Sequence, residues 1–183
     1  MKNKWIIGLF VVGLIPFIWM QMVYFPGQEK LREEENLKQL DPETHDYEKV
    51  LKYENLYMGN ASNDFNLFGN LPLKQHLGTF EIDSGHFLLI TNYGSSEGES
   101  ERTIQQAVIY NTTAAFVLIK NLQQIEMRFP GKSFTVQRSN VEKWFNSNLS
   151  NLIDPVQFKE KVQEPLKKND LDEWLATYTE LMK

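Results

Sequence analysis

The chain has 183 residues, of which 19 are lysine or arginine and 24 are aspartate or glutamate, so its formal net charge is −5 at pH 7. This acidic balance argues against a nucleic-acid-binding surface, and we expect no nucleic-acid partner. The absence of cysteine excludes disulfides, thiolate nucleophiles and cysteine metal ligands.

The amino-terminal segment is an almost unbroken apolar run that begins at Trp5 and ends at Phe25, before the breaker pair Pro26-Gly27. At about 1.5 Å per residue, a helix of this length spans the roughly 30 Å hydrocarbon core of a bilayer. No pair of small residues suited to signal-peptide cleavage follows the run, so we predict an uncleaved transmembrane signal anchor at residues 1–27. A cleaved signal peptide stays open as the alternative.

The anchor opens with a short basic tail that contains Lys2 and Lys4, which is the usual form of an export signal. We therefore expect a single-pass protein of the cell membrane, with its amino terminus in the cytoplasm and its C-terminal domain outside. Basic residues also follow the apolar run, so a count of lysine and arginine does not by itself decide the orientation.

A charged spacer is predicted at residues 28–40, where polar side chains dominate and three glutamates are consecutive. We expect one domain at residues 41–183, because the remaining length suits a single hydrophobic core. Asp41 followed by Pro42 is typical of a helix start, and this pair marks the beginning of the predicted domain.

The residue patterns in the next part of the chain predict one helix and two strands. Ser62 and Asn63 are predicted to cap a short helix. Residues 79–82 and 87–90 form strand patterns on either side of a turn. The second strand is apolar at consecutive positions, so we expect it in the middle of a sheet.

An acidic loop is predicted at residues 94–101, and it lacks the aspartate-rich pattern of a calcium loop. A further strand pattern follows at residues 105–110. Thr112 or Thr113 then provides a cap for a short helix through residues 115–119.

The clearest local pattern is a hairpin around Pro130-Gly131, where apolar and polar residues alternate on both sides. Three helix starts follow, each with a capping residue, at Ser139, Asp154 and Asp170. We therefore predict an α+β domain in which an antiparallel sheet is flanked by short helices, preceded by one N-terminal transmembrane helix.

Four segments of the chain resemble the bacterial domain of unknown function 4825. They are Tyr57 to Asn60 (YMGN), Asn70 to Pro72 (NLP), Ile90 to Tyr93 (ITNY) and residues 114–121 (AAFVLIKN). The resemblance covers about residues 48–144 and leaves a helical C-terminal part at residues 145–183.

The resemblance implies a location and a kind of task. This domain occurs on small membrane-anchored proteins of Gram-positive bacteria and behind some metallopeptidase-type antibiotic sensors. It therefore implies a place in the cell envelope and recognition of a ligand or partner. It brings no catalytic residues, and the chain has no His-Glu-x-x-His motif.

Two sets of residues are candidates for binding. Asn92 and Tyr93 end the predicted central strand and would offer an amide and a phenol to a ligand, although turn bonding of Asn92 and core packing of Tyr93 explain them better. An apolar stripe on the last helix is a candidate partner surface, or it docks on its own domain. Its residues are Trp174, Leu175, Tyr178 and Leu181.

The histidines give little reason to expect a metal or a catalytic site. His45, His76 and His86 are the three histidines, and we interpret them as solvated loop residues, with no metal site and no cofactor. Asp83, Ser84 and His86 are the residue types of a hydrolase, but they are neighbours in a predicted turn, and turn chemistry explains them.

We therefore expect a non-enzymatic, membrane-anchored extracytoplasmic domain of binding or sensor type, held at the membrane through Trp5 to Phe25, with an envelope protein as partner. Two alternatives stay open. The first is a cell-envelope hydrolase that uses Asp83, Ser84 or His86. The second is a structural subunit of a membrane protein complex, which would make contacts through the anchor and the Trp174 helix.

Overall fold

The computed structural model describes residues 14, 16–96, 98–168 and 170–179. The chain divides into two compact units, Met1–Leu37 and Lys38–Lys183. Most of the anchor predicted at residues 1–27 lies outside the described residues, as do Glu97 of the acidic loop and Leu181 of the last stripe. Within the described part, no helix combines the length and the apolar character needed to cross a membrane.

The described part of the first unit is helical. Residues 16–19 lead into a π-helical turn, Met20–Tyr24, and then into α2 (Phe25–Lys38). Pro26 and Gly27, which we predict to break the helix, instead lie inside α2. The π turn just before Pro26 gives the proline ring, which has no N–H to donate, room in a continuous helix.

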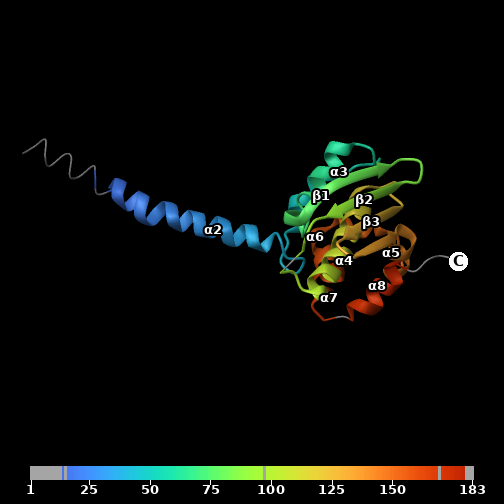
Figure 1. The fold of residues 1–183 in the computed structure, drawn as a ribbon. Helices are drawn as coiled ribbons and strands as arrows, with labels where there is room; N and C mark the ends of the chain where they lie inside the picture. Colours follow the sequence, from blue (N-terminus) through green and yellow to red (C-terminus); the bar gives the residue numbers. More distant parts are fainter. Residues whose placement is uncertain (1–13, 15, 97, 169, 180–183) are drawn as a thin grey trace, which may run out of the picture. The chain divides into compact units, whose positions relative to one another are not determined.

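The second unit is built on a four-stranded sheet (Figure 1). Its strands lie side by side in sequence order: β1 (Leu77–Asp83), β2 (Leu88–Tyr93), β3 (Gln124–Phe129) and β4 (Lys132–Gln137). β1 pairs with β2 and β3 with β4 in antiparallel fashion, but β2 and β3 are parallel. The α+β class is confirmed, whereas the prediction of an antiparallel sheet is wrong, because the sheet is mixed.

The parallel pair exists because α4 (Glu101–Leu118) connects β2 to β3. A crossover helix carries the chain back along the sheet, so that the next strand starts from the same end. Ser100 caps α4 by accepting a hydrogen bond from the amide of Thr103. α4 occupies the residues for which we predict a strand at 105–110 and a short helix at 115–119, so the strand prediction is wrong and the helix is far longer than predicted.

The helical character of α4 is hidden in the sequence because the helix is buried on all sides. Every residue from 106 to 118 is buried, so no polar stripe marks the helical period. Thr112 and Thr113, which we predict as caps, lie inside the helix and donate their hydroxyls to the carbonyls of Val108 and Ile109 at 2.7 Å.

The two faces of the sheet differ in burial. Alternate residues of β2 and β3, such as Leu89 and Ile125, belong to the same hydrophobic core as α4. Their neighbours, such as Ile90 and Glu126, are half-buried on the opposite face. The predicted hairpin between β3 and β4 is confirmed, and Gly131 in its turn has a φ of 80°, which favours glycine.

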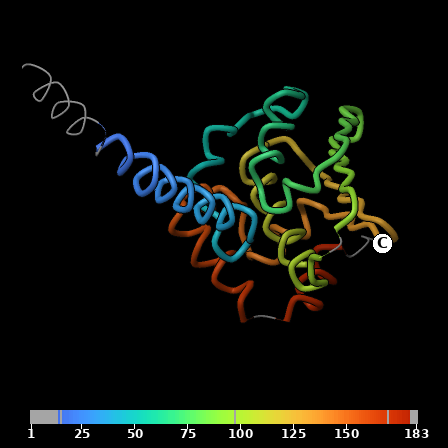
Figure 2. The backbone as a smooth tube through the Cα atoms, turned by 60° about the vertical axis from the view of Figure 1, so that its left-hand side comes forward, coloured from blue at the N-terminus to red at the C-terminus, as the bar shows by residue number. Residues whose placement is uncertain are grey.

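Shorter helices complete the second unit (Figure 2). They are α3 (Ala61–Phe68), α5 (Arg138–Trp144), α6 (Pro155–Phe158), α7 (Glu164–Leu166) and α8 (Leu171–Thr179), with 3₁₀ turns at Tyr47–Tyr53, Lys74–His76 and Leu149–Ile153. The predicted caps Asp154 and Asp170 are confirmed, because their carboxylates accept hydrogen bonds from amides at the starts of α6 and α8.

Three helix starts differ from the predictions. Asp41 closes a turn on the amide of Glu43, and the first helical residues of the unit are capped by Asp46 instead. α3 is capped by Asn60, one residue before the helix begins. Ser139 lies inside α5 and does not start it.

Candidate functional site

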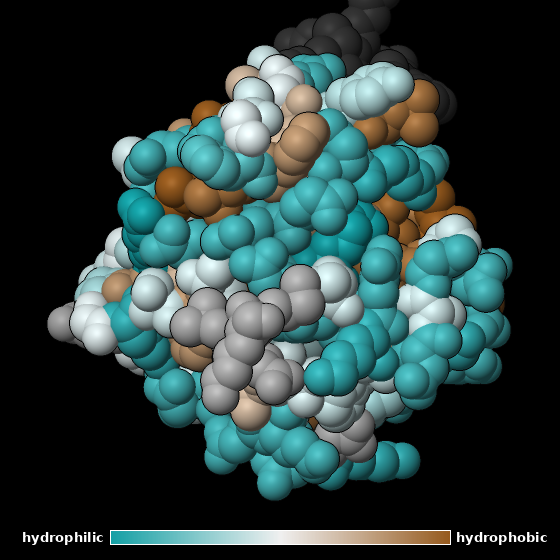
Figure 3. Space-filling view, turned by 90° about the vertical axis from the view of Figure 1, so that its right-hand side faces the viewer, coloured by the Kyte–Doolittle hydropathy of each residue, from teal (hydrophilic) through white to brown (hydrophobic). Residues whose placement is uncertain are grey.

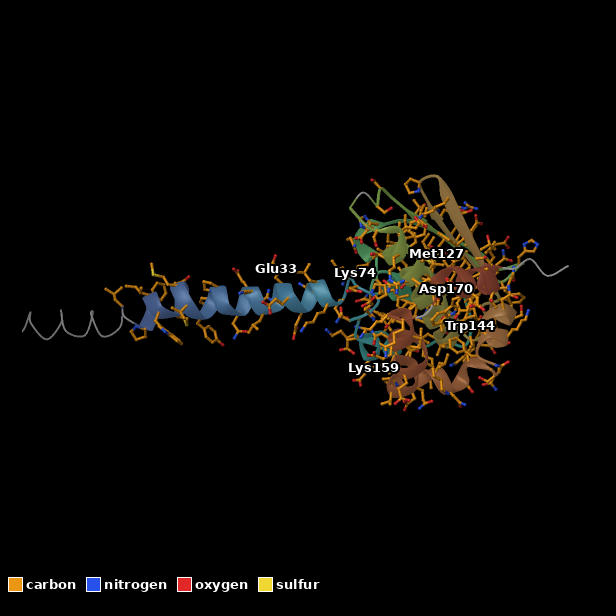
Figure 4. The ribbon with its side chains drawn as sticks, turned by 90° about the horizontal axis from the view of Figure 1, so that it is seen from below. Glu33, Lys74, Met127, Trp144, Lys159 and Asp170 are labelled. Carbon is orange, nitrogen blue, oxygen red and sulfur yellow. The ribbon has the colours of Figure 1, made fainter. Side chains whose placement is uncertain are left out.

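A groove of about 720 Å³ lies between two segments that are distant in the sequence, residues 43–48 and residues 155–167. Lys159, which lines the groove, is labelled in Figure 4. A second hollow of about 600 Å³ is lined by residues between Ser150 and Gln157. Val156 lines both hollows, so the two are neighbours along α6.

One wall of the groove is a helix with a π-helical turn in its middle. α6 is followed directly by the π turn Lys159–Gln163 and then by α7. Lys159, Glu160 and Gln163 of this turn all line the groove. π turns inside α-helices occur frequently at functional sites. The irregular part of the helix therefore coincides with the hollow.

Gln163 fixes the two walls to each other. Its side chain is buried, and its amide nitrogen donates to the carbonyls of Pro42 at 3.0 Å and His45 at 2.8 Å. His45 is part of the opposite wall, and Pro42 is the residue just before that wall. The width of the groove is thus set by hydrogen bonds from a single buried amide.

His45 lies on the inner side of the wall formed by residues 43–48 and is 2% exposed. Its Nε2 is 2.8 Å from the carbonyl oxygen of Asn70, which can only accept, so Nε2 carries the proton. Nδ1 then accepts from the Tyr110 hydroxyl at 2.8 Å. Burial lowers the pKa of His45 to about 4, so the ring is neutral at pH 7. The prediction of a solvated loop histidine is wrong for His45.

Tyr47 lines the groove next to His45 and is 4% exposed. Its ring stacks on Phe158, with the centroids 3.8 Å apart and an interplanar angle of 5°. Its hydroxyl is buried and has no hydrogen-bond partner among the described residues. Burial raises the pKa of this phenol, so the oxygen keeps its proton and offers a donor.

The groove is acidic. Five carboxylates and two lysines line it, and with His45 neutral this lining has a formal charge of −3. They are Glu43, Asp46, Glu48, Glu160, Glu164, Lys159 and Lys167. Lys167 is paired with Glu164 at 3.2 Å. Glu48 and Glu160 are exposed and form no ion pair with any residue that the structure describes.

Asn92 and Tyr93, the predicted ligand-binding pair, lie on opposite faces of the sheet. Asn92 is half-buried on the face away from the core and donates to the Thr79 hydroxyl at 2.9 Å and to Glu81 at 3.2 Å. Tyr93 is buried on the core face and stacks on Phe129 at 4.7 Å. The structure therefore does not bring the two side chains together.

The described residues of the C-terminal stripe, Trp174, Leu175 and Tyr178, are buried in their own domain. Trp174 stacks on Trp144 with centroids 5.0 Å apart, and the Tyr178 hydroxyl lies 2.8 Å from that of Thr113. The surface on the side of α5 and α8 is mainly hydrophilic (Figure 3).

The three residue types of a hydrolase lie on the turn between β1 and β2. His86 Nδ1 is 2.8 Å from an Asp83 oxygen, and this pair lowers the pKa of Asp83. The other Asp83 oxygen accepts from the amides of Gly85 and His86. The His86 side chain is 80% exposed, and the turn lines neither hollow. His76 lies elsewhere, 3.3 Å from Glu99.

The groove itself was missed by sequence reasoning. Its two walls carry ordinary helix and turn signals, and nothing in either segment indicates that they meet. The nearest signal is the caps: Asp46 and Asp154 each start a helical segment that borders the groove. Such caps indicate where each wall begins in the sequence, but they do not indicate that the two walls lie against each other.

Residues 50–138 match the family described as Domain of unknown function (DUF4825). The family model supports a DUF4825 domain at these residues. The match agrees with the predicted span of about residues 48–144 and contains α3, α4 and the whole sheet. All residues that line the two hollows lie outside the DUF4825 match. Comparison with curated proteins and with solved structures gave no match.

Proposed function

We propose that this chain is a membrane-anchored extracytoplasmic recognition domain that holds part of an envelope protein in the acidic groove. The observation that supports this most directly is the groove, whose walls come from residues 118 positions apart and are fixed by Gln163 and His45. A hollow kept open by buried hydrogen bonds is pre-organised for a ligand, because little further ordering is needed on binding.

The chemistry of the groove favours binding over catalysis. His45 uses both ring nitrogens in buried hydrogen bonds and is neutral, so it has no free nitrogen to act as a base. Tyr47 keeps its proton because burial raises its pKa. The remaining lining consists chiefly of carboxylates, lysines and apolar side chains, which recognise charge and shape.

Membrane attachment is supported by the apolar residues at the start of the chain. In the described part, apolar side chains from Phe17 to Phe25 are exposed around the helix. Exposed apolar surface of this extent marks contact with a membrane or with another protein. The basic tail with Lys2 and Lys4 favours export of the domain that lies C-terminal to the apolar run.

Photocrosslinking in intact cells tests the recognition function. A benzophenone amino acid placed at Glu48 or Lys159 would lie on the two walls of the groove, and the same group at the exposed Ala176 on α8 is the matched control. We expect one protein to be captured from both groove positions and not from Ala176. Equal capture from all three positions, or none from the groove, would contradict the proposal.

The absence of cysteine allows a clean topology experiment. A single Ala176→Cys change introduces one thiol on the surface of the domain. We expect a membrane-impermeant maleimide to label it in intact cells, and deletion of residues 1–27 to abolish membrane retention. Labelling only after lysis would contradict the extracytoplasmic placement.

A further inference from the structure

We infer that the occupant of the groove is an extended protein segment that carries lysine or arginine side chains. This inference rests on the proposed function and names its ligand class. It follows from the charge of the groove, from its length along α6, and from a buried donor in its wall that has no acceptor.

The charge of the groove selects a cationic ligand. Glu43 and Glu48 stand on one wall and Glu160 on the other, so carboxylates face the hollow from both sides. Glu43 already accepts a hydrogen bond from Gln106 at 2.6 Å, whereas Glu48 and Glu160 are exposed and form no ion pair with the described residues, although Lys159 lines the same groove. Like charges held close together attract a positive partner and disfavour an acidic one.

The shape of the groove selects an extended segment over a compact ligand. Val156, which is 60% exposed, lines both the hollow of about 720 Å³ and the hollow of about 600 Å³. Both are open to solvent, whereas sites for small molecules usually enclose most of the ligand surface. A peptide that follows α6 would contact Val156 with an apolar side chain and place basic side chains beside the carboxylates.

Tyr47 is the independent sign of a ligand. The residue is 4% exposed and lines the groove, and its hydroxyl has no acceptor among the described residues. A buried donor without a partner destabilises the domain. The hydroxyl is covered by the groove wall, so an acceptor from an occupant would relieve that cost once the Tyr47 side chain turns toward the groove. The backbone carbonyls of an extended peptide are acceptors of this kind.

Fluorescence anisotropy with the full chain in a neutral detergent tests the inference. The probes are three labelled peptides of the same length, built from Ser-Lys-Val, Ser-Gln-Val or Ser-Glu-Val repeats. We expect the lysine peptide to bind at least about tenfold more tightly than the glutamine peptide, the glutamate peptide not to bind, and the lysine affinity to fall as salt is raised.

A pair of charge-matched variants locates the binding. Glu48→Gln with Glu160→Gln removes two carboxylates from the groove, and Glu81→Gln with Glu173→Gln removes two exposed carboxylates elsewhere. We expect the groove pair to weaken the lysine peptide by about three- to tenfold and the control pair to leave it unchanged. Circular dichroism on all variants verifies that they fold.

The outcomes separate this inference from the proposed function. If the glutamine peptide binds as tightly as the lysine peptide and Val156→Trp blocks both, the groove binds but the cationic class is overturned. If both charge pairs weaken the lysine peptide equally, or if no peptide binds, the cationic class is likewise overturned. Capture of a protein at Glu48 in cells would then still support the recognition function.

Discussion

The hydroxyl of Tyr110 in α4 donates a hydrogen bond to Nδ1 of His45 over 2.8 Å, and the other ring nitrogen of His45 donates to the carbonyl of Asn70. This pair ties the segment that leads into the domain to its central helix. Both hydrogen bonds in this direction require a neutral ring, so the attachment of the segment depends on pH.

Stability is expected to fall as the pH drops from 6.5 toward 4. Burial lowers the pKa of His45 from 6.5 to about 4, so in this window the unfolded chain binds a proton that the folded chain does not. The contribution of neutral His45 to the free energy of unfolding is complete above pH 6.5 and is lost as the pH falls toward 4. A shift of this size corresponds to roughly 3 kcal/mol. Urea titrations at a series of pH values measure the free energy of unfolding.

The variant His45→Gln isolates this contribution. Glutamine does not titrate, while the charged neighbours that also act on His45, Asp46, Lys49 and Lys74, are unchanged. We expect the variant to be less stable than the wild type at pH 7 and to lose less stability between pH 6.5 and 4. Parallel pH profiles for the two proteins would show that His45 is not the buried neutral group described here.

Arg138 is expected to be a main stabilising residue of the end of α4. Its guanidinium donates to the carbonyls of Phe116, Ile119 and Leu122 at 2.6, 2.7 and 2.5 Å. Phe116 lies in the last turn of α4 and Ile119 is its C-cap, where a helix end leaves carbonyls without partners, and Leu122 lies in the connection to β3. Arg138→Met should lower the free energy of unfolding by about 3 kcal/mol, because several buried acceptors are then unpaired. Urea denaturation followed by far-UV circular dichroism measures the loss.

Arg138→Lys is the matched control for this prediction. Lysine keeps the positive charge. It lacks the planar guanidinium with its five N–H donors and has a single ammonium group instead. We expect it to recover less than half of the stability that Arg138→Met loses. A lysine variant as stable as the wild type would mean that the charge, and not the geometry of the three hydrogen bonds, is what matters.

Trp174 is expected to stabilise the domain by packing. It is fully buried and stacks on Trp144, and its indole N–H has no hydrogen-bond partner in the described part of the chain. Trp174→Ala should cost about 3–5 kcal/mol. Trp174→Phe should cost clearly less, because it keeps an aromatic ring and removes an unpaired donor. Thermal unfolding of the two variants gives the comparison, and equal losses would contradict it.

Asp64 is expected to be destabilising in its charged form. It is fully buried in α3, one oxygen accepts from the Gly59 amide at 3.0 Å, and the other has no partner among the described residues. Burial raises the pKa of this carboxyl, so the charge costs stability at neutral pH. Asp64→Asn should raise the free energy of unfolding by about 1 kcal/mol at pH 7.

The pH dependence of the Asp64→Asn gain gives the check on its cause. A raised pKa in the folded state means that the wild type is favoured at low pH and loses stability as the pH rises from the ordinary pKa of the carboxyl through the raised one. The gain should therefore shrink as the solution is acidified. A gain that is constant with pH would point to packing and not to the charge.

The parts of the fold that depend on neighbouring residues were predictable from the sequence. The hairpin at Pro130-Gly131 shows alternation within each strand, and Asp154 and Asp170 cap helices that start within three residues of them. In each case one short segment contains both the signal and the structure.

The parts that depend on burial were not predictable. α4 has no polar stripe because it is surrounded by the core, so its middle residues look like a strand followed by a short helix. A prediction that divides α4 in this way contains no crossover helix between β2 and β3. It therefore does not predict their parallel pairing.

The groove and the state of His45 depend on contacts between distant segments. His45 has polar neighbours in the sequence, and its burial results from Tyr110 and Asn70, which lie 65 and 25 positions away. In the sequence, Gln163 looks like an ordinary polar residue of an exposed helix. Its role is visible only in the folded structure, where it donates to the carbonyl of Pro42. No local pattern in either segment contains this information.

The hydrogen bonds from Gln163 to Pro42 and His45 also order the events of folding. They close a loop of about 120 residues, since the partners are 121 and 118 positions apart. The strand pairs β1–β2 and β3–β4 close far shorter loops, and short loops form first because they lose less chain entropy. The DUF4825 core is thus able to assemble early, and the groove appears only when the last third of the chain has reached the first residues of the domain. A chain that stops before Pro155 would lose one wall of the groove and also the buried core side chains Phe158, Trp174 and Tyr178, so it would be far less stable than the full domain.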